Sequence, residues 1–183
     1  MPLRKIVIIG PESTGKSTLC EGLAAHFQTD WVREYAREYL EEHGMGYSYE
    51  TLSMIARGQL ALEDKGVAAK EARGEAVGGN DLLFVDTDLY VIKVWSEYVF
   101  GRCEAWILNE IVRRKYDGYL LANTDLPWAD DPLREYPDPG IRDRLFHIYK
   151  DLLINQSVPW AEVKGVGDKR LQQAIGAVEG LLK

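Results

Sequence analysis

The chain has 183 residues, of which 46% are hydrophobic and 28% are charged, and its formal net charge is −7. This length and composition predict a soluble globular chain with a substantial core, and we expect one domain over residues 1–183. The acidic balance argues against a nucleic-acid partner. No apolar run is long enough to span a membrane, and the amino-terminal run is too short for a secretory signal. We therefore expect no membrane partner and a cytoplasmic location.

The first predicted elements are a strand and a helix with a glycine-containing loop between them. Residues 5–9 (KIVII) are typical of a buried parallel strand. Leu19, Leu23 and Phe27 then recur at helical spacing. The loop therefore lies where the chain leaves a sheet and a helix begins.

That loop has the spacing of the phosphate-binding P-loop, with Gly10, four residues, Gly15, Lys16 and Ser17. Glycine lets the backbone approach a phosphate closely, so that successive amides and the helix N-terminus can bind it. Lys16 would reach the β- and γ-phosphates of ATP as a catalytic residue, and the Ser17 hydroxyl would bind Mg²⁺. We predict a nucleotide site to which the other loop residues also contribute: Glu12, Ser13, Thr14 and Thr18.

The rest of the chain alternates between strand-like and helix-like stretches. In order, these are strand 31–33, a helix through Leu40 that stops near Gly44, helix 50–72 ended by GEAVGGN (74–80), strand 81–85, helices 90–100 and 104–115, strand 118–122, helix 141–154, strand 159–163, and a closing helix carrying Leu171, Ala174, Ile175, Val178 and Leu182. Five strands with intervening helices predict an α/β fold, a three-layer parallel sheet of the P-loop NTPase type that resembles nucleoside and nucleotide kinases.

Charged residues follow the predicted second strand, in VREYAREYL. Sheet enzymes bind substrates at the carboxyl ends of their parallel strands, so we expect Glu34 to bind and orient the substrate hydroxyl. Arg37 lies three residues further along, where it could pair with Glu34 at the substrate. A solvated, charged helix is the alternative.

Two aspartates follow the predicted third strand, in LLFVDTD. Asp86 could hold Mg²⁺ through water, opposite Ser17, or it could instead be the N-cap of the helix that includes Leu89. Asp88 is the second candidate, beside Glu34, for orienting the acceptor hydroxyl. Thr87 stands where hydrolytic ATPases often carry a water-orienting glutamate, and this favours a kinase.

Residues 124–140 are polar, contain prolines and are long for a loop, which predicts an active-site lid of approximately residues 124–144. Arginines that arrive on lid closure would stabilise charge on the transferred phosphoryl group. Arg134 is the first such candidate and Arg142 the second, with surface charge as the alternative for Arg142. After the last strand, Arg170 closes the stretch GVGDKR (165–170), which would border the adenine or form an ordinary helix-entry turn.

Four stretches together resemble the nicotinamide riboside kinase domain of NadR-type proteins: GPESTGKSTL, VREYAREYL, FVDTDLY with VWSEYVFG behind it, and LPWADDPLRE. The similarity runs from the P-loop to the final helix. The resemblance implies a P-loop kinase that transfers the γ-phosphate of ATP to the 5′-hydroxyl of nicotinamide riboside, a small-molecule substrate, giving nicotinamide mononucleotide for NAD salvage.

The resemblance also implies that Trp128 packs against the nicotinamide ring and that acidic groups near Glu34 and Asp88 hold the ribose. The ring carries a fixed positive charge, which suits an aromatic face with carboxylates nearby. Trp128 with Asp130 and Asp131 would supply those groups on the lid. Two other functions fit the sequence: a kinase of another nucleoside or nucleotide, and a non-catalytic protein that uses ATP to order the lid for a partner.

Overall fold

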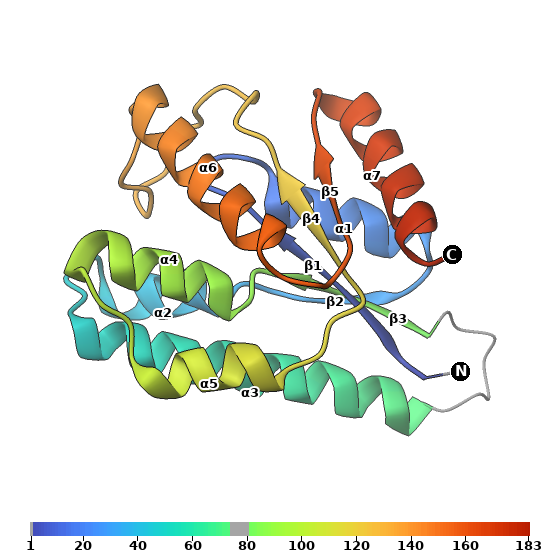
Figure 1. Ribbon diagram of the computed structural model, residues 1–183, viewed down its shortest axis with the longest axis horizontal. Helices are drawn as coiled ribbons and strands as arrows, with labels where there is room; N and C mark the ends of the chain where they lie inside the picture. The colour runs from blue at the N-terminus through green and yellow to red at the C-terminus, as the bar shows by residue number, and fades with distance from the viewer. Residues whose placement is uncertain (1, 74–80) are drawn as a thin grey trace.

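The computed structural model describes residues 2–73 and 81–183 (Figure 1). Strands and helices alternate along the chain as the sequence predicts. In chain order they are β1 (Arg4–Ile9), α1 (Lys16–His26), β2 (Asp30–Val32), α2 (Tyr35–His43), α3 (Tyr49–Arg73), β3 (Leu82–Asp86), α4 (Leu89–Phe100), α5 (Ala105–Arg113), β4 (Gly118–Ala122), α6 (Pro139–Ile154), β5 (Trp160–Val163) and α7 (Gly167–Leu181).

The strands form a parallel sheet in the order β2-β3-β1-β4-β5, with β1 at the centre. In this register Ile8 of β1 lies opposite Asp86 of β3, and Ile9 lies opposite Leu121 of β4. The carboxyl ends of parallel strands share one edge of the sheet, so the loop that follows β1 begins beside Asp86.

The side chains of β1 alternate between two buried layers. Ile6 and Ile8 belong to the core formed with α1 and α7, whereas Val7 and Ile9 belong to the core formed with α3, α4 and α6. All four side chains are fully buried. Helices on both faces explain why this strand is an unbroken apolar run, and the predicted three-layer α/β fold is confirmed.

One predicted boundary differs where β4 leads into α6. The loop expected through Gly140 ends at Asp138, whose carboxylate caps α6 by accepting from the Ile141 amide at 2.8 Å. Pro139 fits the first helical turn because its missing N–H needs no partner there. Residues 139–144 of the predicted lid therefore belong to a helix and not to a loop. The glycine-rich stop predicted at residues 74–80 lies outside the described residues.

Within the described part of the chain, no helix is both long and apolar enough to cross a membrane.

Candidate active site

The loop between β1 and α1 is shaped by two glycines. Gly10 has φ +148°, and a Cβ atom there would lie only 2.7 Å from the carbonyl oxygen of Ala122 in β4. Gly15, with φ 73°, is the N-cap residue of α1. This turn brings the unpaired amides and the positive dipole end of α1 to the loop, which is the arrangement that binds phosphate.

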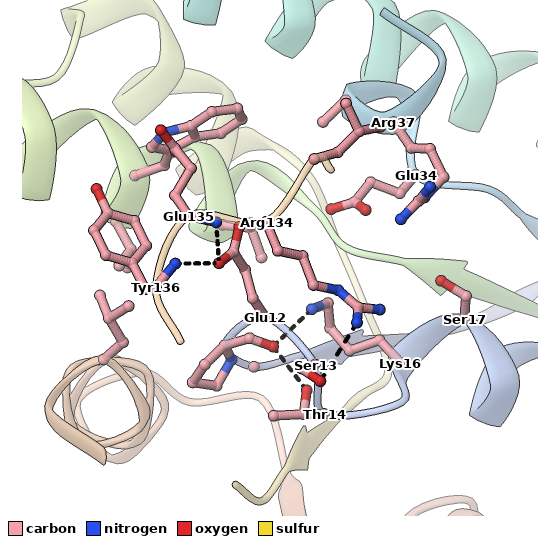
Figure 2. Close-up of a pocket in the computed structure, with 18 of the residues that line it drawn as sticks. Glu12, Ser13, Thr14, Lys16, Ser17, Glu34, Arg37, Arg134, Glu135 and Tyr136 are labelled. Carbon is pink, nitrogen blue, oxygen red and sulfur yellow. Dashed lines mark hydrogen bonds between the residues drawn. The ribbon is translucent and has the colours of Figure 1, made fainter. Parts of the chain in front are cut away.

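The side chains of Thr14 and Lys16 (Figure 2) both donate to the carbonyl oxygen of Pro11 and so close the loop. Thr14 Oγ1 donates to this oxygen at 2.8 Å, and Lys16 Nζ donates at 2.9 Å. Thr14 is fully buried, whereas Lys16 lines a cavity together with loop residues 10–18. The flexible lysine chain can exchange this carbonyl for a phosphate oxygen.

Ser17 and Asp86, the predicted magnesium ligands, are in direct contact. Ser17 Oγ donates to Asp86 Oδ2 at 2.5 Å, and Asp86 Oδ1 is buried with no hydrogen-bond partner among the described residues. Burial and the charge of Glu34 raise the pKa of Asp86 to about 7. A cation here would engage the orphaned oxygen and favour the ionised carboxylate.

No group of three His, Cys, Asp or Glu side chains in residues 2–73 and 81–183 could hold a metal ion. Mg²⁺ in phosphoryl-transfer sites usually takes only one or two protein ligands, and phosphate oxygens and water complete its shell. One hydroxyl and one carboxylate therefore fit this ion.

Asp88 lies in different surroundings from Asp86, with Thr87 at a left-handed φ of 66° between them. Asp88 is buried, accepts from the Tyr90 amide at 2.9 Å as the N-cap of α4, and accepts from the Tyr119 hydroxyl at 2.8 Å. Burial raises its pKa to about 7. The cap considered for Asp86 is thus made by Asp88, which the structure does not bring to the cavity lining.

Glu34 lies at the start of α2 and lines the cavity with Lys16 and Ser17 (Figure 2). The expected pairing of Arg37 with Glu34 is wrong. The Arg37 guanidinium instead binds Asp131 at 2.5 Å and Glu41 at 3.3 Å. Arg37 therefore ties α2 to the segment between β4 and α6, and Glu34 stays on the cavity without that partner.

The β4–α6 segment, residues 123–138, lies against the P-loop. Glu12 accepts from the amides of Glu135 and Tyr136, both at 3.0 Å (Figure 2). Ser13 Oγ accepts from the Ala129 amide at 2.9 Å. Arg134 lines the cavity, as predicted for a lid arginine, and donates to the carbonyl oxygen of Ala129 and to Ser13 Oγ.

Neither Arg142 nor Trp128 lines the cavity. Arg142 is 5% exposed and donates to the carbonyl oxygens of Ser13 at 3.1 Å and Leu126 at 3.2 Å, so it supports the loop backbone. The Trp128 ring lies 5.9 Å from the Arg134 guanidinium and 5.8 Å from that of Arg142. Trp128 is not part of the cavity lining, and two neighbouring cations make this ring a poor platform for a positively charged ligand.

Arg170 also supports the loop rather than lining the cavity. Only 4% exposed, it donates to the carbonyl oxygens of Thr14, Asn123 and Gly165, each at 2.9 Å, and to the Asp125 carboxylate at 2.7 Å. These acceptors engage both terminal nitrogens of its guanidinium group, and the predicted adenine contact of Arg170 stays a prediction.

Part of the cavity lining is aromatic and was largely missed by sequence reasoning. It comprises Trp95 and Tyr98 of α4, Tyr136 of the β4–α6 segment and Tyr149 of α6. Trp95 and Tyr98 lie in the stretch VWSEYVFG, whose spacing also fits a core helix. The sequence does contain a pattern that could have indicated this wall. Val91, Val94, Trp95 and Tyr98 share one face of α4, and the rings of Trp95 and Tyr98 carry polar atoms.

Comparison with known proteins gives a family match over most of the chain. A family described as an AAA domain matches residues 5–170. The trifunctional NAD biosynthesis/regulator protein NadR of Salmonella typhimurium is 28% identical over 166 residues, which cover 88% of this chain. The match covers only 38% of that relative's length.

Solved structures share the fold. A NadR protein in complex with NR superposes with a TM-score of 0.77 at 20% identity, covering 97% of this chain and 49% of that one. A NadR complex with NAD and AMP-PNP gives 0.72 at 21% identity, with the same coverage. A deoxyadenosine kinase from M. mycoides gives 0.60 at 13% identity, covering 96% of this chain and 99% of that one. The chain therefore shares the fold of these three proteins, which is that of a P-loop NTPase.

Proposed function

The chain belongs to the AAA-domain family that matches residues 5–170, and from this premise we propose that it is an ATP-dependent kinase that phosphorylates the 5′-hydroxyl of nicotinamide riboside. The similarity to NadR, together with the solved NadR complexes with NR and with AMP-PNP, supports a nucleoside-kinase type of enzyme. The product would be nicotinamide mononucleotide, which would give the protein a place in NAD salvage.

One observation carries the proposal. Lys16, Ser17 and Glu34 line one cavity at the carboxyl end of the parallel sheet (Figure 2), and Ser17 Oγ donates to Asp86. The first two features suit a nucleoside triphosphate with its cation, and the third is a carboxylate suited to a hydroxyl acceptor. A phosphate donor and an acceptor alcohol can therefore meet in one cavity.

The residues divide the reaction between them. The loop amides and Lys16 hold the β- and γ-phosphates of ATP. The oxygen of the 5′-hydroxyl bonds to the γ-phosphorus while Glu34 accepts the proton of that hydroxyl. The bond between that phosphorus and the bridging oxygen breaks, and ADP leaves. Ser17 and Asp86 would hold Mg²⁺, which when bound neutralises charge on the phosphates. Arg134 is placed on the cavity to stabilise charge on the transferred group.

The acceptor would lie against Trp95, Tyr98 and Tyr136. Aromatic faces with the carboxylates of Glu34 and Glu135 on the same cavity suit a ring with a fixed positive charge. We therefore assign the ring contact to this wall rather than to Trp128.

Incubation with ATP, Mg²⁺ and a panel of nucleosides, followed by mass spectrometry, tests the proposal. We expect a monophosphate from nicotinamide riboside in preference to the other nucleosides. Product only from another nucleoside would refute the acceptor assignment. Nucleotide binding without phosphorylation of any acceptor would refute the kinase and favour a protein that ATP switches.

A further inference from the structure

Glu12 is a residue that phosphate binding does not explain. The P-loop spacing leaves its position free, and a carboxylate there has the wrong charge for a triphosphate. In the structure this carboxylate accepts from two successive backbone amides, those of Glu135 and Tyr136, both at 3.0 Å (Figure 2). Two hydrogen bonds to one side-chain oxygen fix this short stretch to the P-loop.

The same stretch is held from a second direction by Tyr47, in the connection between α2 and α3. The Tyr47 hydroxyl donates to Glu135 Oε2 at 2.7 Å. The Tyr47 ring meets Trp95 edge to face, with ring centroids 4.8 Å apart. Glu135, Tyr136 and Trp95 all line the cavity, whereas Tyr47 does not.

We propose that Glu12 and Tyr47 are positioning residues that hold Glu135 and Tyr136 as a wall of the acceptor cavity, and that Glu12 thereby couples the nucleotide loop to acceptor binding. The inference rests on the proposed function in one respect, that the acceptor occupies this cavity. A nucleotide that orders the P-loop would order Glu12 and this wall with it, and thermodynamic reciprocity requires the acceptor to favour nucleotide binding equally.

Hydrogen exchange of the ligand-free protein tests the Glu12 contact directly. We expect the Glu135 and Tyr136 amides to exchange at least about 10-fold faster in Glu12→Ala than in the wild type. Glu12→Gln keeps a side-chain oxygen that can accept both hydrogen bonds, so its exchange should stay near the wild-type rate. The β1 amides are the internal control, because their exchange reports global stability. Wild-type exchange of the Glu135 and Tyr136 amides in Glu12→Ala would overturn the inference.

Steady-state kinetics with nicotinamide riboside test the consequence. Tyr47→Phe removes only the hydroxyl, and we expect the acceptor KM to rise about 5- to 10-fold, with kcat and the ATP KM within about 2-fold of wild type. Tyr39→Phe is the matched control, since Tyr39 stacks on His43 and does not line the cavity. Glu12→Ala should raise the acceptor KM in the same sense, and Glu12→Gln should restore it.

The two possible failures are distinguishable. Wild-type protein that binds AMP-PNP but phosphorylates no nucleoside would refute the proposed function and, with it, the acceptor half of this inference. An active wild type whose acceptor KM is unchanged by both Tyr47→Phe and Glu12→Ala would refute this inference alone.

Discussion

Lys16 is the residue whose loss should cost the most activity. Its ammonium group sits on the cavity 2.9 Å from the Pro11 carbonyl oxygen, within the loop proposed to hold the phosphates. We expect Lys16→Ala to lower kcat/KM by at least about 100-fold, because the charge on the transferred group would lose a cation that stabilises it. Lys65→Ala, on the exposed side of α3, removes a lysine charge away from the cavity and should leave the rate unchanged. A Lys16→Ala enzyme that turns over at nearly the wild-type rate would contradict the phosphate assignment.

Glu34 should affect the chemical step rather than nucleotide binding. Glu34→Gln keeps the size of the side chain but removes the carboxylate that would take the hydroxyl proton, so kcat should fall by about 100-fold or more. The affinity for AMP-PNP, measured by calorimetry, should stay within about 2-fold of wild type. Lost nucleotide affinity with intact kcat would instead place Glu34 at the nucleotide.

At the scale of elements, Asp88 ties the start of α4 to β4. Its carboxylate caps the helix at the Tyr90 amide and accepts from the Tyr119 hydroxyl. Asp88→Ala should lower the free energy of unfolding, measured in urea, by about 1–3 kcal/mol, since it removes the cap and leaves a buried hydroxyl unpaired. Asp88→Asn keeps an accepting oxygen and should recover most of this loss with kcat little changed. An Asp88→Asn protein that is stable but has a much lower kcat would show instead that Asp88 takes part in the reaction.

The contrast between Asp86 and Asp88 illustrates what the sequence could predict. Local patterns predicted the strands, the helices and the P-loop, because each depends on neighbouring residues: KIVII is apolar on both faces, and Gly10 and Gly15 are spaced for one turn. These patterns could not distinguish the roles of Asp86 and Asp88, because the Asp88 carboxylate accepts a hydrogen bond from Tyr119, which lies 31 residues away in the sequence. They also could not show what lies beside Trp128 and Arg170, since the neighbours of these side chains come from other segments.

At the scale of the whole molecule, the P-loop backbone is supported from both helical layers of the sheet. Arg142 of α6 donates to the Ser13 carbonyl oxygen, and Arg170 of α7 donates to that of Thr14. These two helices belong to cores on opposite faces of the sheet. Carbonyls held outward in this way leave the neighbouring amides free for phosphate, so the shape of the loop depends on the packing of both layers.

Arg170→Met tests this dependence, since methionine can occupy much of the buried space but donates no hydrogen bond. The Asp125 carboxylate is partly exposed to solvent and can do without Arg170, but leaving three carbonyls without their donor should lower the free energy of unfolding by about 1–3 kcal/mol. AMP-PNP affinity should fall about 10-fold, because the nucleotide would have to order a more mobile P-loop when it binds, and this ordering is unfavourable. Arg144→Met makes the same substitution at an exposed site on α6 and should change stability by less than about 0.5 kcal/mol. Urea unfolding and calorimetry measure both quantities, and wild-type values for Arg170→Met would mean that the loop keeps its shape without support from α7.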